Sequence, residues 1–240
     1  MRLMPVPMLA LACLALAGCE STQERSARLE RAAHRKAVVQ SASGLKIGSP
    51  SRSVEVISAT ALHTSEGTAV AVLLGNTGPA QREVPLLISV GQGGGPPVTN
   101  SEPGLARSLI SSAYVPAHGT AVWVDDQLTL TGRPGAVEAK VGEGKPATGP
   151  APKIELGAHR LEREPSGEAL TGTVTNRSPV AQHELPVYAV ATRGGRTVAA
   201  GRGVVDALAP GASGKFTIFL VGTGAQGAKL TLSAPPSTFG

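Results

Sequence analysis

Short motifs in the second part of this chain repeat motifs that occur 100 residues earlier, and this repeat constrains the fold more than any other feature. Gly-Thr-Ala-Val at 67–70 recurs as Gly-Glu-Ala-Leu at 167–170, and Asn-Thr-Gly-Pro at 76–79 recurs as Asn-Arg-Ser-Pro at 176–179. Beyond these motifs the offset slips, first by one residue and then by more. A stepwise loss of register is what changes in loop length produce between two copies of one fold. The chain is therefore expected to contain the same domain twice.

Each copy has the pattern of antiparallel β-structure. In residues 170–175, Leu, Gly and Val alternate with three threonines, a period of two that is typical of a strand with one face in water. Gly194-Gly195 lies between two apolar runs and indicates a hairpin turn. No helical periodicity persists after residue 50. About seven short strands over roughly 85 to 90 residues favour an all-β fold made of two tandem immunoglobulin-like antiparallel β-sandwiches.

The composition limits both the cores and the partners. Aromatic residues make up only 2% of the chain, whereas Gly and Pro number 30 and 19, so the cores must consist of Val, Leu, Ile and Ala. The net charge is +5, but the basic residues are scattered along the chain. Nucleic-acid binding needs a basic patch together with aromatic side chains on which bases stack. We therefore expect no nucleic-acid partner.

The N-terminus has the composition of a secretory signal. Arg2 precedes an apolar run from Leu9 to Leu16 that is too short to span a bilayer of about 30 Å. The run ends in Leu16-Ala17-Gly18-Cys19, a sequence that resembles the lipobox of bacterial lipoproteins. The resemblance implies cleavage between Gly18 and Cys19, diacylation of the Cys19 thiol and usually acylation of the new amino group, with chains such as palmitate.

The sequence therefore predicts five parts: signal peptide 1–18, tether 19–52, immunoglobulin-like domain 53–143, Pro/Gly linker 144–152 and immunoglobulin-like domain 153–240. The tether is either a helix whose arginines rest on anionic lipid headgroups or a solvated stalk. Cys13 is removed with the signal and Cys19 carries lipid, and these are the two cysteines of the chain. The mature protein is accordingly expected to have no disulfide.

The second copy also resembles the small bacterial immunoglobulin-like domains of the FxLYD type. The shared elements are a strand at 172–176 that runs into an Asn turn, a Val-rich strand, a Gly turn, and Pro210-Gly211 before an aliphatic strand. Tyr-Ala-Val-Ala at 188–191 stands in the region of that family's aromatic-Leu-Tyr-Asp signature. The resemblance implies a fold found on lipid-anchored and cell-surface proteins, and it implies no general catalytic activity.

Two glycine-rich segments match nucleotide-binding patterns only in part. Gly222–Gly227 has the GxGxxG spacing, but a strand pattern follows it where a dinucleotide site needs a helix. Residues 209–216 lack the first glycine of a phosphate loop and end in Phe216 where that loop has Ser or Thr. Both segments are expected to be turns, and no cofactor is expected.

No constellation for metal binding or catalysis is evident. None of the five histidines lies three or four residues from another, and none is beside a cysteine. Asp125-Asp126 and Glu143 lack the alternating oxygen ligands and the glycine of a calcium loop, and a solvated strand end is expected there instead. The Gly-x-Ser-x-Gly elbow of a serine nucleophile is missing too. We therefore expect no catalytic residues and no metal ligands.

The two copies differ on one face of an early strand. Where the second copy has Thr171 and Thr173, which face water, the first copy has Ala71 and Leu73. Trp123, the one tryptophan, aligns with an outward position of its strand. Because contiguous apolar residues on a solvent face usually mark a contact, Ala71, Leu73 and Trp123 form a candidate contact face against the second copy or a partner. The alternative places Trp123 in its own core, with the register off by one residue.

These observations predict a lipid-anchored protein of the cell envelope, on the extracytoplasmic side of a bacterial membrane. The expected role is a non-enzymatic binding or scaffold module, with the membrane as one partner through the lipid and an envelope protein or wall component as the other. One alternative is a carrier or accessory subunit that presents a small ligand to a membrane complex. Another is an enzyme of unrecognised type.

Overall fold

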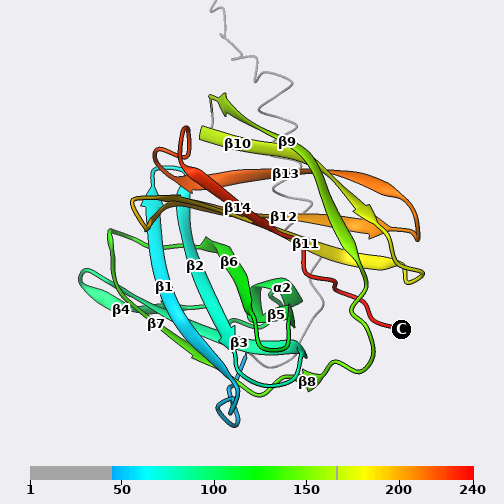
Figure 1. The fold of residues 1–240 in the computed structure, drawn as a ribbon. Coiled ribbons are helices and arrows are strands. Elements are labelled where there is room, and N and C mark those ends of the chain that lie inside the picture. The colour runs from blue at the N-terminus through cyan, green and yellow to red at the C-terminus, as the bar shows by residue number, and fades with distance from the viewer. Residues whose placement is uncertain (1–44, 166) are drawn as a thin grey trace, which may run out of the picture. The chain divides into compact units, whose positions relative to one another are not determined.

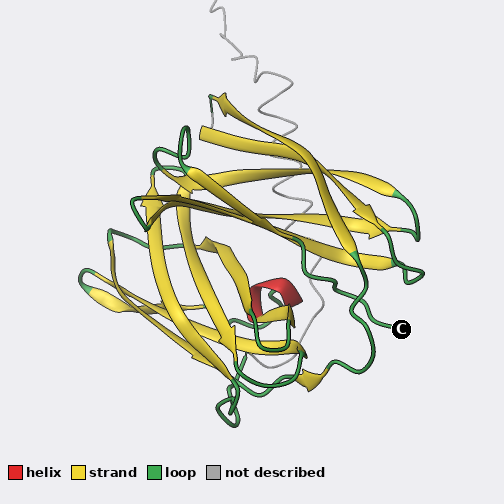
Figure 2. Cartoon of the chain, viewed as in Figure 1, coloured by secondary structure: helices red, strands yellow, loops and turns green. Residues whose placement is uncertain are grey.

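The computed structural model describes residues 45–165 and 167–240, which belong to one compact unit. Their regular structure is almost entirely antiparallel β-strand (Figure 2), which confirms the predicted all-β class. Within those two ranges the helical structure is the short α2 (Arg107–Ile110). The predicted signal peptide, the predicted cleavage site at Gly18 and Cys19, and most of the predicted tether lie outside the described residues.

The first half of the described chain forms two facing sheets (Figure 1). Its strands are β1 (Val54–Thr64), β2 (Gly67–Asn76), β3 (Gln81–Gln92), β4 (Gly95–Thr99), β5 (Ser111–Val115), β6 (Thr120–Leu128), β7 (Pro134–Val141) and β8 (Lys145–Pro146). One sheet has the order β1-β2-β6. In the other, β3 is the central strand and pairs with β4, β5, β7 and β8.

The second half contains β9 (Ile154–Glu164), β10 (Gly167–Asn176), β11 (Gln182–Arg193), β12 (Arg196–Leu208), β13 (Ser213–Gly222) and β14 (Lys229–Ser233). Its strand order is β14-β11-β12-β13-β10-β9. The pairing between β12 and β13 consists of only two residue pairs, Ala199 with Gly222 and Ala200 with Val221. This half is therefore a sandwich of β9-β10-β13 and β14-β11-β12 whose two sheets touch along one corner.

The strands repeat as the sequence motifs do. β9 and β10 begin and end 100 residues after β1 and β2, and β11 begins and ends 101 residues after β3. β1-β2-β6 of the first half corresponds to β9-β10-β13 of the second in order and direction of pairing. Even the irregularities recur, because β1 and β9 both carry a bulge a few residues after their start. The two halves are copies of one fold with different loop lengths.

Asn76 and Asn176 occupy the same turn in the two copies. Each side-chain amide donates hydrogen bonds to two backbone carbonyls, at 2.8 and 2.9 Å for Asn76 and at 2.8 and 3.0 Å for Asn176. Each side-chain oxygen accepts a backbone N–H two residues further on, from Gly78 in one case and Ser178 in the other. Both asparagines are buried. One side chain thus ties the turn to the loop before β6 in the first half and to the end of β12 in the second.

Replacing Asn176 by alanine is expected to lower the free energy of unfolding by about 2 kcal/mol, because buried backbone groups lose their partners. Urea unfolding followed by far-UV circular dichroism measures this change. Thr173→Ala, at an exposed position of the same strand, is the control and should stay within about 0.5 kcal/mol of the unsubstituted protein. Equal midpoints for the two variants would contradict a structural role for Asn176.

The halves differ in the strand that follows β3 or β11. In the second half this is the continuous strand β12, whereas the first half has two shorter strands, β4 and β5, with α2 between them. Asn100 fills the gap: its side-chain oxygen accepts the N–H of Ile88, and its amide donates to the carbonyls of Leu86 and Leu109. The backbone groups of β3 that have no strand partner at this point are therefore still satisfied.

Branched and small aliphatic residues dominate both cores, as the composition predicts. Examples are Val72, Leu86 and Ile88 in the first half and Leu170 and Ile218 in the second. The segment predicted as the 144–152 linker begins with β8, which pairs with β3. Its first residues therefore belong to a sheet of the first half.

Candidate functional site

The two halves meet along a buried junction, which is the candidate functional site. β12 packs against β2 and β6. Four residues of the second half, Tyr188, Val190, Ala200 and Val221, lie in the same apolar cluster as the first-half core. Tyr188 pairs with Arg202, and Val190 pairs with Ala200, across β11 and β12. The side chains of Tyr188, Arg202, Val190 and Ala200 therefore share one face of their sheet. This face is turned away from the second half's own core.

Ala71 and Leu73 lie on β2, the strand that packs against β12. Ala71 is 7% exposed and pairs with Val124, while Leu73 is half-buried and pairs with Val122 on β6. In the second half the position equivalent to Leu73, Thr173, is exposed. The comparison between the copies thus drew attention to the strand that packs against β12.

Trp123 does not share a face with Ala71 and Leu73, and in this respect the predicted contact face was wrong. Trp123 pairs directly with Val72, so its side chain lies on the opposite side of the sheet. The equivalent pair in the second half is Gly172 with Phe216. The expected alignment had placed β6 one residue out of register, and a slip of one residue moves a side chain to the other face. Trp123 is a fully buried core residue.

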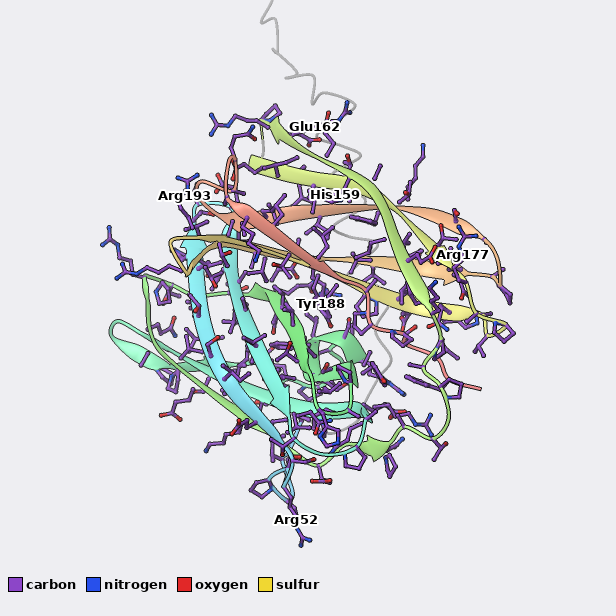
Figure 3. The ribbon with its side chains drawn as sticks, viewed as in Figure 1. Arg52, His159, Glu162, Arg177, Tyr188 and Arg193 are labelled. Atoms are coloured by element: carbon purple, nitrogen blue, oxygen red, sulfur yellow. The ribbon has the colours of Figure 1, made fainter. Side chains whose placement is uncertain are left out.

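A polar network links the halves at Ser108 of α2. The carbonyl oxygen of Ser108 accepts the indole N–H of Trp123 at 2.8 Å and the hydroxyl of Tyr188 at 3.4 Å. Its hydroxyl oxygen accepts an N–H of the Arg202 guanidinium at 3.0 Å. Figure 3 shows Tyr188 between the strands of the two halves. A single helical residue therefore contacts the core of one half and the outer sheet face of the other.

An ion pair crosses the same junction. The backbone N–H of Arg202 donates to one oxygen of Asp126 at 3.0 Å, and the guanidinium Nε lies 3.5 Å from the other oxygen. The Arg202 side chain is 5% exposed and that of Asp126 is 15% exposed. At 3.5 Å the guanidinium contact is an ion pair and not a well-formed hydrogen bond. Since water screens it little, this pair interacts more strongly than the surface pairs of the chain.

Asp125, the residue before, is buried on the other side of β6. It pairs with Val70, and its carboxylate accepts the backbone N–H of Gln127 at 2.9 Å. The pKa of Asp125 is raised to about 7, chiefly by burial and in smaller part by the neighbouring Asp126, while the hydrogen bond from Gln127 and the charge of Arg202 act to lower it. Burial likewise raises the pKa of Tyr188 above its usual value. The sequence prediction had assigned Asp125 and Asp126 to a solvated strand end, and the structure corrects this assignment.

A hollow of about 200 Å³ opens beside the junction. Its lining includes Glu83, Arg107, His183, Glu184 and Phe239, so both halves and the C-terminal segment contribute. Lys145 and Arg107 lie 2.8 and 3.4 Å from Glu83. The hydrogen bond from Lys145 is the main reason that the pKa of Glu83 is lowered. Polar and apolar surface contribute about equally to the wall of the hollow. Its Glu83 carboxylate is paired with two cations.

The C-terminal segment binds both halves. Gln182, which is fully buried, accepts the backbone N–H groups of Ser237 and Thr238 at 2.9 and 3.2 Å and donates to the carbonyl of Thr238 at 3.0 Å. The ring of Phe239 lies 5.7 Å from the ring of Tyr114 on β5. The segment therefore closes the side of the junction next to the hollow.

The GxGxxG segment is a turn, as predicted. The backbone N–H groups of Ala225 and Gln226 donate to the carboxylate of Glu168 at 2.9 and 3.3 Å. The Arg193 guanidinium binds the carbonyls of Gly224 and Gln226. The strand β14 follows. Groups that would hold a phosphate in a nucleotide site are engaged within the protein.

Within residues 45–165 and 167–240, no group of three or more His, Cys, Asp or Glu side chains is arranged to hold a metal ion. Nor does any helix there have the length and hydropathy needed to cross a membrane. Comparison with known protein families, with curated proteins and with solved structures finds no match to this chain.

Sequence reasoning missed Arg202, Ser108 and Tyr188. One signal was available, because β11 is apolar at both alternating sets of positions, with Tyr188 and Val190 on the set that should face water. A strand that is apolar on both faces is covered on both faces. The role of Ser108 had no such signal, because it depends on where the loop before β5 folds.

Proposed function

We propose that this protein is a lipid-anchored component of a bacterial cell envelope and that its two sandwiches bind another envelope protein or a wall component without catalysing a reaction. The observation that carries the proposal is the order of segments. A lipobox at residues 16–19 is followed by a tether of about thirty residues, and then by two copies of one β-sandwich. A lipid anchor restricts the two sandwiches to the membrane surface, and the tether sets how far from it they reach.

The junction supports a binding module over a carrier of small ligands. Ligand pockets usually have about 300 to 1,000 Å³ and mostly apolar walls. The hollow beside the junction is smaller, and charged or polar groups line much of it. The contacts between the halves consist of buried apolar residues and a buried ion pair. Contacts of this kind hold two domains in one orientation. Such a body presents a fixed set of loops and strand edges to a partner.

Cys19→Ser is expected to abolish lipid attachment. Cells fed an alkyne analogue of palmitate should label the unsubstituted protein and leave Cys19→Ser unlabelled, either released from the membrane or as an uncut precursor. Each buried CH₂ contributes about 0.8 kcal/mol, and two or more acyl chains are needed for stable anchoring. Cys13→Ser is the matched control and should label normally, because that residue leaves with the signal. Full membrane retention of a processed Cys19→Ser protein would overturn the anchor.

The binding role is tested in intact cells. Cross-linking of the anchored protein, followed by mass spectrometry, should give specific adducts with an envelope protein, or the purified protein should sediment with isolated cell-wall sacculi. The Cys19→Ser protein should lose the adducts if the anchor brings the sandwiches to their partner. An anchored protein with neither adducts nor sacculus binding would contradict the module while leaving the anchor in place.

A further inference from the structure

Two consecutive aspartates on β6 face opposite sides of its sheet at the junction of the halves. Asp125 pairs with Val70 and is 2% exposed on the side of the first-half core. Asp126 lies in a bulge, where β6 has one residue more than β2 between neighbouring pairs. A bulge re-aims the side chains that it carries, and here Asp126 reaches Arg202 on β12.

One guanidinium, that of Arg202, is the positive charge next to Asp125 and Asp126, and it cannot balance two ionised carboxylates. Arg202 on β12 and Asp126 on the same strand are the charged groups that act on Asp125. The other elements that pack here supply uncharged groups: β2 presents Val70, β11 the hydroxyl of Tyr188 and α2 Ser108. With Asp125 neutral, one carboxylate faces one guanidinium. With Asp125 ionised, two carboxylates share it in a region with little water.

An ionised Asp125 is costly where it lies. Its carboxylate accepts one hydrogen bond, from the backbone of Gln127, whereas a buried carboxylate is stable only when it is paired and fully hydrogen-bonded. Hydration would relieve this cost, and the Asp126–Gln127 bulge beside it is the part of β6 that is least held by strand pairing. Opening the bulge would move Asp126 away from Arg202.

We propose that the Asp125–Asp126 pair makes the contact between the two halves sensitive to pH, so that the junction is closed in mildly acidic solution and loosens as the solution becomes alkaline. The direction follows from burial. Because burial raises the pKa of Asp125 to about 7, the folded protein holds a proton that the unfolded chain releases near pH 4. The stabilisation due to this proton is complete at low pH and is lost as the pH rises through about 7.

Hydroxyl-radical footprinting of the mature, full-length lipoprotein in detergent micelles measures the opening, with radical dose set by an added dosimeter. Tyr188 is fully buried at the closed junction and reports its opening. Trp123 is fully buried in the first-half core and reports unfolding of that half. We expect the oxidation of Tyr188 to rise at least threefold between pH 6 and pH 8 while that of Trp123 stays constant.

Two variants identify the titrating group. Asp125→Asn keeps the acceptor for Gln127 and cannot ionise, so its Tyr188 should stay protected at both pH values. Asp126→Asn weakens the pair with Arg202 and should expose Tyr188 at both. A pH step that persists in Asp125→Asn would overturn the proposal, as would a Tyr188 signal that is flat in the unsubstituted protein. A parallel rise at Trp123 would also overturn it, since the first half would then be unfolding.

Discussion

Replacing Trp123 by alanine is expected to lower the free energy of unfolding by about 3 to 5 kcal/mol, the usual cost of emptying a large aromatic site in a core. Trp123 has no exposed surface, and among the described residues it is the largest fully buried side chain. The substitution also leaves the Ser108 carbonyl without its 2.8 Å hydrogen bond from the indole. Apart from Tyr188, the apolar cluster around Trp123 is aliphatic, so these neighbours are smaller than the side chain that is removed.

The measurement is urea unfolding followed by far-UV circular dichroism, because the substitution removes the fluorophore. Phe216→Ala is the matched variant in the second half, since Phe216 occupies the same position opposite Gly172. It should cost a similar amount. Trp123→Phe should cost less than Trp123→Ala, because most of the apolar volume is kept. A loss below about 1 kcal/mol for Trp123→Ala would show that Trp123 does not lie in a packed core.

The repeat and the alternation in the sequence predicted the strands well, and they failed at one register. β1, β2 and β3 recur at nearly constant offsets, so their faces could be read from either copy. β13, the counterpart of β6, begins only 93 residues after it, because the loops before the two strands differ in length. Nothing in the sequence places the gap in those loops, and an error of one residue inverts the face of every side chain in the strand. Trp123 was assigned to the wrong face for this reason.

The break between β4 and β5 was also beyond prediction. It depends on Asn100, which replaces a missing strand partner for β3 through three hydrogen bonds. An asparagine between two strands reads as a turn residue in any sequence. Only the position of β3 in the fold shows that Asn100 is buried and forms hydrogen bonds with backbone groups of that strand.

For the junction, the sequence pointed to one strand, β2, and not to the residues that hold the halves together. Comparing the copies singled out Ala71 and Leu73, because the same fold tolerates threonine at these positions in the second half. The partner residues Arg202 and Asp126 lie 76 residues apart in the chain. Charged residues within strands usually lie on a solvated face, so neither indicated a buried pair. Their pairing follows from the packing of β12 on β6, which no local pattern encodes.

The Asp126–Arg202 pair should be strongly coupled in a double-mutant cycle. Breaking a buried ion pair from one side leaves a charge without its counter-ion, and such changes cost about 3 to 5 kcal/mol in protein interiors. Arg202→Met should lower the free energy of unfolding by about 2 to 3 kcal/mol, at or below the lower end of this range. The cost is smaller because the backbone N–H of residue 202 still donates to Asp126. Asp126→Leu should cost more, because it leaves this N–H without an acceptor and the guanidinium without its counter-ion.

The double variant Asp126→Leu with Arg202→Met distinguishes this coupling from simple loss of packing. Both charges are then gone, two apolar side chains face the Val190 and Ala200 cluster, and exchange of a buried pair for apolar residues is often neutral or stabilising. We expect the double variant to be more stable than Asp126→Leu alone, with a coupling energy of about 2 kcal/mol from urea unfolding at pH 6. Additive costs within about 0.5 kcal/mol would mean that the two residues do not interact. A positive coupling would mean that the junction depends on this charge pair.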